Sequence, residues 1–158
     1  MTHKEFVSYF QEDLFLPNLE APSKESALTR LIDHLVEKTR IKAKDGNIIL
    51  EALKKRESLG STGIGKNLAI PHGRSTVTNS LTVLYARSVK GILWDSLDDK
   101  PVHFIFLILA PHQEKENHYL PLLGKIVEFA RDANVRRKLM KVDTHAGLLE
   151  VLEKAKEK

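Results

Sequence analysis

The sequence predicts an α/β fold, a three-layer single domain over residues 1–158 with a central mixed β-sheet flanked by helices on both faces. Segments with apolar residues at three- and four-residue spacing come before and after two extended segments. One of these extended segments is apolar almost throughout, as in a strand that is buried on both faces. The length of 158 residues is typical of one domain.

The N-terminal segment is expected to begin with a short helix. Residues 2–10 place Phe6, Tyr9 and Phe10 at helical spacing, which predicts that these side chains face the core. Residues 13–20 contain a proline and are expected to be extended.

Two amphipathic helices are expected next. Ser23 is a suitable N-cap for the first, whose apolar residues recur at three- and four-residue spacing: Leu28, Leu31, Ile32, Leu35 and Val36. His34 lies off this stripe, so we expect it to have a solvent-facing or packing role. A turn at residues 45–46 separates this helix from the second one, which is expected to end near Ser58.

The two extended segments differ in their hydrophobic pattern. Residues 81–89 alternate between apolar and polar positions, which predicts a half-exposed strand. Residues 102–109 are nearly all apolar, which predicts a fully buried strand. His103 is near the start of this strand and is expected to hydrogen-bond to neighbouring backbone.

Helices are expected over the remaining chain. Glu116 or Asn117 is a suitable cap for a leucine-rich helix, so His118 is expected at its N-terminus. Further helical segments are predicted over residues 134–141 and from Thr144 into the charged last six residues, which we expect to be a fraying, solvated end.

Composition excludes several classes of chemistry and location. The chain has no cysteine, so disulfides, thiolate catalysis and cysteine-ligated zinc are excluded. Its longest apolar run, residues 104–110, is too short to cross a bilayer, and no export signal is visible in residues 1–20. We therefore expect a soluble, cytoplasmic protein that is not inserted in a membrane.

The net charge of +4 invites a nucleic-acid hypothesis. Acidic and basic residues are interleaved, however, and the basic clusters at residues 54–56 and 136–138 have no aromatic neighbours that could stack on bases. Solvated helix faces are the favoured interpretation, and a modest positive field would favour an acidic or phosphorylated protein partner.

The segment with the strongest indication of chemistry is residues 60–73. It contains three glycines, Gly60, Gly63 and Gly65, beside two hydroxyl residues, and Pro71 then precedes His72. Such a backbone can present several N–H groups to an anion. A histidine beside an anion-binding loop is a possible phosphoryl acceptor.

Two other interpretations of the histidines and glycines are weaker. Gly60, Gly65 and Lys66 have the spacing of an ATP-binding P-loop, but Asn67 stands where a magnesium-binding Ser or Thr is required, and the segment follows a helix instead of a strand. His103, His112 and His118 lack the four-residue spacing of metal ligands on one helical face. We therefore expect neither a metal nor another cofactor.

Phosphoryl transfer through His72 has a physical basis in these residues. A neutral imidazole has a free lone pair near neutral pH and attacks phosphorus without a separate base. Gly60 and Gly63 would supply N–H donors, Ser61 or Thr62 a hydroxyl, and Arg56 a fixed positive charge. A tight glycine turn beside an incidental histidine is the competing interpretation, and these residues alone leave both open.

Residues 56–65 together with residues 69–73 resemble the signature around the phosphorylated histidine of a known family. That family is the enzyme IIA domains of the bacterial phosphotransferase system, of the fructose, mannitol and nitrogen-regulatory class. The resemblance extends to residues 94–102 and to Ala110 and Pro111 followed by His118. It covers about residues 14–152.

The resemblance implies a phosphotransferase that carries a transient phosphohistidine. According to this resemblance, His72 accepts the phosphoryl group from a histidine-containing phosphocarrier protein. His118 would lie opposite His72 and stabilise the phosphoryl group, and Arg56 would neutralise the charge of that group. The next partner would be a IIB domain or a regulated target protein.

The branch within the family is left open. Residues 60–65 and the short chain resemble the nitrogen-regulatory type, whereas a IIA component for fructose or mannitol uptake would look nearly the same. A third hypothesis, from another class, is a non-catalytic interaction module that binds a regulator or transporter.

Overall fold

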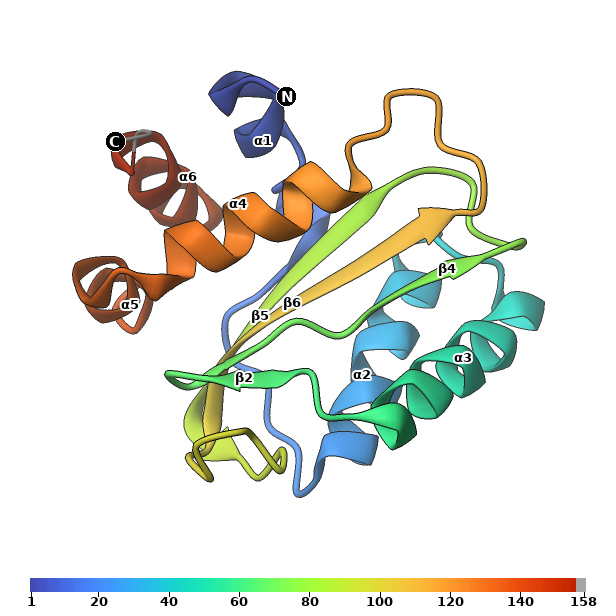
Figure 1. Cartoon of the computed structure of the whole chain (residues 1–158), viewed down its shortest axis with the longest axis horizontal. Coiled ribbons are helices and arrows are strands. Elements are labelled where there is room, and N and C mark those ends of the chain that lie inside the picture. Colours follow the sequence, from blue (N-terminus) through green and yellow to red (C-terminus); the bar gives the residue numbers. More distant parts are fainter. Residues whose placement is uncertain (156–158) are drawn as a thin grey trace.

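The structure is a computed structural model, which describes residues 1–155. Within these residues one mixed sheet contains the strands β1 (Phe15–Leu16), β2 (Gly63–Gly65), β3 (Leu68–Ala69), β4 (His72–Ser75), β5 (Thr82–Ile92) and β6 (Val102–Pro111). The helices are α1 (His3–Ser8), α2 (Lys24–Glu37), α3 (Gly46–Leu59), α4 (Tyr119–Arg131), α5 (Ala133–Leu139) and α6 (His145–Lys154), with 3₁₀ turns at Glu12–Leu14 and Ala43–Asp45. Helices α2 and α3 cover one face and α4 covers the other, as Figure 1 shows, so the predicted fold class is confirmed.

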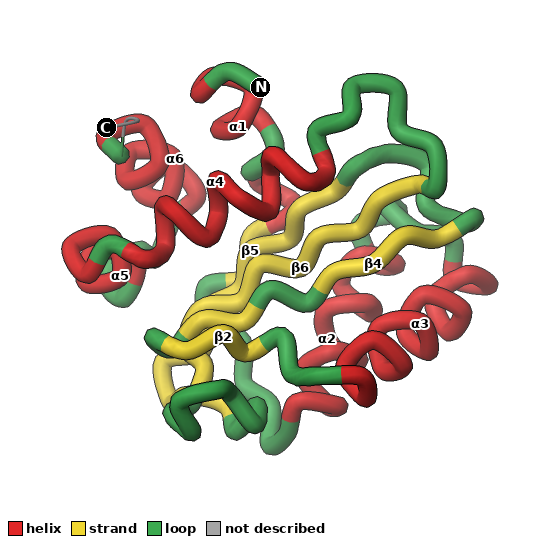
Figure 2. Tube along the Cα trace, in the orientation of Figure 1, coloured by secondary structure: helices red, strands yellow, loops and turns green. Residues whose placement is uncertain are grey.

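The strand β6 is central to the sheet. It pairs antiparallel with β5 along most of its length, for example Val83 with Ile108, and β1 extends the sheet parallel to β5. On its other edge β6 pairs in parallel with β3 and then with β4. The path that carries β2, β3 and β4 therefore runs along one edge of the long strands (Figure 2).

Two hydrophobic cores lie on the two faces of this sheet. The residues of β6 alternate between them, since Phe104, Phe106 and Ile108 pack with α4, α5 and α6, whereas Ile105, Leu107 and Leu109 pack with α2 and α3. This two-sided burial explains the almost continuous apolar run over residues 102–109.

The capping prediction for the first long helix is confirmed. The Ser23 hydroxyl accepts from the Ser26 N–H at the start of α2, and the Thr144 hydroxyl accepts from the Gly147 N–H at the start of α6. His34 has a packing role, since its Nε2 lies 2.7 Å from the Asp13 carbonyl oxygen. His103 Nδ1 lies 2.7 Å from the Ser88 carbonyl oxygen, as expected.

The expectation of a half-exposed strand over residues 81–89 is wrong, because residues 83–88 of β5 are all buried. Helices pack on both faces of the sheet, so the polar position at Arg87 also lies inside. Its guanidinium donates to the carbonyl oxygens of Pro17, Leu139 and Met140 and to the Asp143 carboxylate. These acceptors, two of them at the end of α5, compensate for burying the charge.

The predicted cap of the leucine-rich helix is also wrong. His118 is the N-cap residue of α4, and its side chain accepts no capping hydrogen bond. The Glu114 carboxylate instead accepts from the N–H groups of His118 and Tyr119, at 2.9 and 3.1 Å. Asn117 has a φ of 53° in the turn that brings Glu114 back to the helix.

The C-terminal prediction is tested only in part. The helix α6 ends at Lys154, and the remainder of the charged segment, residues 156–158, lies outside the described residues. Over residues 1–155, no helix combines the length and the hydropathy that crossing a membrane requires.

Tyr85 provides a test of the core on the α4 side of the sheet. Its hydroxyl is buried without a hydrogen-bond partner, and burial raises the pKa of this phenol above its ordinary value. Because Tyr85→Phe removes only this unpaired group, we expect the free energy of unfolding to rise by about 1 kcal/mol. Urea denaturation of the two proteins measures the change, and a clear loss of stability would contradict the absence of a partner.

Candidate functional site

The glycine-rich segment forms a β-hairpin at the sheet edge. Strands β2 and β3 pair antiparallel, and Lys66 and Asn67 form the two-residue turn between them, with φ of 56° and 64°. Positive φ at both central residues is the requirement of a type I′ turn, which Asn tolerates well. The hairpin leads directly to Pro71 and His72.

The donors of the predicted phosphate-binding loop have partners within the protein. The Thr62 hydroxyl and N–H donate to the Glu57 carboxylate, and the Ser61 hydroxyl donates to the Trp94 carbonyl oxygen at 3.1 Å. The Gly63 N–H donates to the Ser61 hydroxyl, and the Gly60 N–H donates to the Glu57 carbonyl oxygen. A phosphate-binding role for Gly60, Ser61, Thr62 and Gly63 stays a prediction, which would need these donors to exchange partners.

His72 is the first residue of β4 and is half-buried. It pairs with Ile108 of β6, and the preceding carbonyl of Pro71 accepts from the Ile108 N–H at 2.9 Å. Its ring Nδ1 lies 2.7 Å from the carbonyl oxygen of Ile70. A carbonyl oxygen only accepts, so Nδ1 carries the hydrogen and the neutral ring has its lone pair on Nε2.

Tyr119 and Arg74 lie beside this ring. The rings of His72 and Tyr119 pack edge to face with centroids 6.3 Å apart, and the guanidinium carbon of Arg74 lies 4.6 Å from the centroid of the Tyr119 ring. Alternation along β4 places His72 and Arg74 on the same side of the strand. Arg74 also donates to the Pro111 carbonyl oxygen at 3.3 Å.

Arg56 approaches the same region from the last turn of α3. Its guanidinium donates to the Gly60 carbonyl oxygen at 2.8 Å. Leu53, one helical turn earlier, lies beneath Gly73 of β4, at 3.9 Å from where a Cβ of that glycine would be. Burial raises the pKa of Tyr119, while the positive charges of Arg74 and Arg56 act in the opposite direction. The phenol therefore keeps its proton with two guanidinium groups in its surroundings.

The ring of His118 has neighbours in the N-terminal segment. Its Nδ1 lies 2.8 Å from the Tyr9 hydroxyl, the two rings meet edge to face, and its Nε2 lies 3.5 Å from a carboxylate oxygen of Glu5. The family resemblance implied that His118 lies opposite His72. The ring of the next residue, Tyr119, packs on His72. The role of His118 in stabilising a phosphoryl group stays a prediction.

Sequence reasoning missed Arg74, Tyr119, Tyr9 and Glu5. Only Arg74 could have been found from the sequence, because a residue two positions after His72 on a strand lies on the same side of that strand. The contacts of the other three depend on how α1 and α4 pack, which no local pattern contains. Among residues 1–155, no three of the acidic and histidine side chains come together as a metal site.

The chain matches, over residues 8–155, the family described as "Phosphoenolpyruvate-dependent sugar phosphotransferase system, EIIA 2". It belongs to this family, so the family predicted from the histidine motif is confirmed.

Curated relatives carry two kinds of name. The chain is 36% identical over 141 residues to the fructose-specific EIIA component of Haloferax volcanii, covering 88% of this chain and 90% of that protein. It is 35% identical over 127 residues to a nitrogen regulatory protein of Bradyrhizobium diazoefficiens, covering 80% of each. The family to which this chain belongs indicates phosphoryl transfer in general.

Solved structures agree with the fold. The nitrogen regulatory protein IIA-Ntr of Neisseria meningitidis superposes with a TM-score of 0.83 at 26% identity, over 94% of this chain and 99% of that one. IIA mannitol of Escherichia coli has a TM-score of 0.73 at 19% identity, over 90% and 97% of the two chains, and shows the fold alone.

Gly63 offers a test of the hairpin that precedes His72. A Cβ at this position would meet the hydroxyl oxygen of Ser96 and would lie 3.0 Å from Trp94 Cδ1 and 3.1 Å from the Ser96 Cα. Because backbone and a buried indole cannot move aside freely, we expect Gly63→Ala to lower the free energy of unfolding by about 1–3 kcal/mol.

Gly124→Ala is the matched control, measured in the same urea titrations. Gly124 lies on the exposed side of α4 with open space around it, so alanine should be neutral or stabilising there. Equal stability of Gly63→Ala and the unchanged protein would mean that the close contact with Ser96 is absent.

Proposed function

We propose that this protein is a phosphohistidine carrier, which accepts a phosphoryl group from a histidine-containing phosphocarrier protein on Nε2 of His72. The observation that supports this is the short contact between His72 Nδ1 and the Ile70 carbonyl oxygen. It fixes the hydrogen on Nδ1 and leaves the Nε2 lone pair available, which is the form of the ring that attacks phosphorus.

The transfer step balances without a metal or a separate base. The Nε2 lone pair of His72 attacks phosphorus as the bond between phosphorus and the donor histidine breaks, and the donor ring keeps that electron pair. The attacking ring becomes more positive as the new P–N bond forms, and the Ile70 carbonyl oxygen, 2.7 Å from Nδ1, stabilises that charge.

The phosphoryl oxygens need positive charge and donors. Arg56 on α3 and Arg74 on β4 provide fixed positive charges. The protonated phenol of Tyr119 is influenced by both charges, and its ring packs on the His72 ring. We propose that Arg56 neutralises charge during transfer, as predicted, and that Arg74 is a second cation for the same group. Positive charges also favour approach of the negatively charged phosphorylated donor.

The proposed role within the family is nitrogen regulation, in which the phosphorylation state controls a target protein. The IIA-Ntr structure, which this chain covers almost completely, supports it. The second candidate is a stand-alone IIA component that passes the group to a IIB domain in fructose-type uptake, which the fructose-specific relative supports. The proposed compartment is the cytoplasm in either case.

The function is tested with phosphoenolpyruvate, enzyme I and the phosphocarrier protein. We expect one phosphoryl group that is labile in acid and stable in alkali, detected by intact mass and located on His72 by fragmentation. The His72→Ala variant should not be labelled, because it has no nucleophile there. His34→Gln, a change on the far helix α2, should be labelled like the unchanged protein. Persistent labelling of His72→Ala would refute the proposal.

The non-catalytic alternative gives a different result. A pure interaction module would bind its partner equally well as the unchanged protein, as His72→Ala and as a variant with an acidic residue at position 72. Unequal affinities, measured by titration calorimetry with a candidate IIB domain or regulatory target, would exclude a pure interaction module. The partner that binds would identify the branch of the family, nitrogen regulation or sugar uptake.

Arg74 allows a test of the second cation. Arg74→Ala should slow phosphorylation by the carrier roughly tenfold or more, because a charge-assisted contact to the phosphoryl group is lost. Arg74→Lys should recover part of the rate, since it restores charge without the planar guanidinium. Arg30→Ala, which removes an exposed charge beside Gly91, serves as the control in rapid-quench measurements. Identical rates for the Arg74→Ala and Arg30→Ala variants would remove Arg74 from the site.

A further inference from the structure

The helix α1 supplies partners for both ring nitrogens of His118. The Tyr9 hydroxyl lies 2.8 Å from Nδ1, and a Glu5 carboxylate oxygen lies 3.5 Å from Nε2. The His118 side chain is 13% exposed, so water is largely replaced by these two groups. No comparison and no sequence pattern assigns a role to Tyr9 or Glu5.

These two contacts select one tautomer of the neutral ring. A carboxylate only accepts, so the hydrogen of the neutral imidazole is on Nε2, toward Glu5. Nδ1 then has the lone pair and accepts from the Tyr9 hydroxyl. Burial, followed by the negative charges of Glu114, Glu116 and Glu5, raises the pKa of Tyr9, so its hydroxyl keeps the hydrogen that this bond requires.

Glu5 is anchored in α1 and is charged. Its second carboxylate oxygen accepts from the Thr2 N–H at 2.9 Å, while its own N–H donates to the Thr2 hydroxyl at 3.1 Å, which is a capping box. The Thr2 hydrogen bonds, and to a smaller extent His118, lower the pKa of Glu5. The Glu5 side chain is 48% exposed, so water screens its contact with His118 and the contact contributes little free energy.

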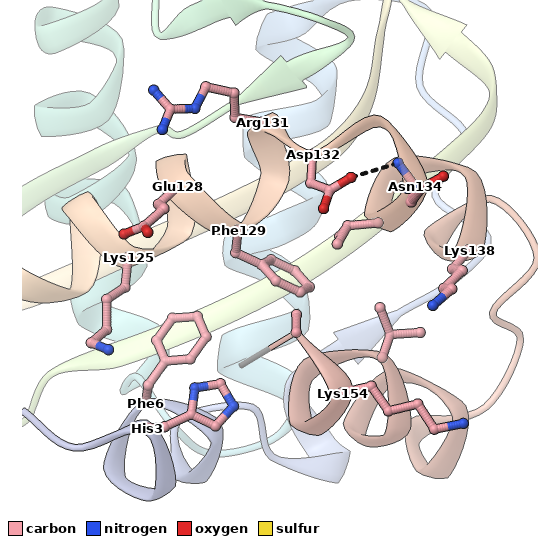
Figure 3. A pocket seen from close by; sticks show the side chains of 13 residues that line it. His3, Phe6, Lys125, Glu128, Phe129, Arg131, Asp132, Asn134, Lys138 and Lys154 are labelled. Atoms are coloured by element: carbon pink, nitrogen blue, oxygen red, sulfur yellow. Dashed lines mark hydrogen bonds between the residues drawn. The ribbon is translucent and has the colours of Figure 1, made fainter. Parts of the chain in front are cut away.

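The helix α1 is itself held by packing against α4. Phe6 is buried, and its ring meets Phe129 of α4 edge to face with centroids 6.3 Å apart. Figure 3 shows Phe6 and His3 from α1 facing Phe129, along one side of a pocket of about 520 Å³ between α1, α4, α5 and α6. His3 Nε2 lies 2.9 Å from the Leu152 carbonyl oxygen and ties α1 to α6. The short helix is therefore a fixed support for Tyr9 and Glu5.

We propose, resting on the function proposed above, that Tyr9 and Glu5 are positioning residues for His118. Tyr9 orients the ring through Nδ1, and the Glu5 carboxylate holds the Nε2 hydrogen until an oxygen of the phosphoryl group on His72 replaces it. Both the carboxylate and the phosphoryl group are anions, so they compete for one donor. Phosphorylation of His72 then releases Glu5 from His118, so the contact between His118 and the N-terminal helix depends on the phosphorylation state.

The first experiment needs no phosphorylation. Nitrogen-15 NMR of the unphosphorylated protein, in alkaline buffer where imidazoles are neutral, should show His118 with its hydrogen on Nε2. In Tyr9→Phe the Nδ1 signal of His118 should shift, because Nδ1 loses its hydrogen-bond donor. Tyr85→Phe makes the same chemical change at a hydroxyl with no partner and should leave the His118 signals unchanged. Unchanged His118 signals in Tyr9→Phe would overturn the positioning role.

The second experiment separates the two residues by the sign of their effects. Tyr9→Phe should slow phosphorylation of His72 by roughly threefold to tenfold, because one neutral hydrogen bond no longer orients the ring. Glu5→Gln keeps the capping box but removes the competing charge. It should raise the phosphorylated fraction at equilibrium with the carrier, with an equilibrium constant roughly twofold to fivefold higher.

Glu128→Gln on α4 is the control for the change of charge, and it should leave the equilibrium constant unchanged. A Glu5→Gln variant whose equilibrium constant equals that of Glu128→Gln would overturn the competition between carboxylate and phosphoryl group. If the carrier does not label the unchanged protein, the proposed function fails, and the NMR measurement decides the positioning of His118 independently.

Discussion

The hydrogen bond between Nδ1 of His72 and the carbonyl of Ile70 is the constraint on which the proposed phosphoryl transfer depends. It joins two residues on either side of a proline, so its geometry is set by a rigid segment of backbone. The strand β6 holds that segment, because the Ile108 N–H donates to the Pro71 carbonyl oxygen and β4 continues the pairing from His72 onward. The His72 ring is therefore oriented by backbone that the central strand of the sheet holds.

The groups around this nitrogen come from elements that are distant in sequence. Arg56 lies on α3, Arg74 on β4 and Tyr119 at the start of α4, and they meet at the end of β6 where the sheet edge is formed by β4. A helix on each face of the sheet and the edge strand deliver these groups, so the layered fold brings two positive charges close to Tyr119. The N-terminal helix adds a negative charge, Glu5, beside His118, the residue that precedes Tyr119.

The glycine-rich segment has a structural role beside the phosphate-binding role that its composition predicts. Its donors satisfy the buried carboxylate of Glu57, and the Lys24 ammonium lies 3.2 Å from the same group. Gly63 is needed because Ser96 and Trp94 approach too closely for a side chain. The segment therefore fixes the path of the backbone into Pro71 and His72.

The sequence by itself determined the fold class, the helix that Ser23 caps, the buried strand over residues 102–109 and the family, because each depends on local periodicity, capping chemistry or a short motif. Only the tertiary structure decided that Arg87 is buried, since its acceptors come from α5 and beyond. It likewise decided that Tyr119 packs on His72 while His118 faces Tyr9 and Glu5. These contacts join residues up to 109 positions apart, and no local pattern records which helices will pack together.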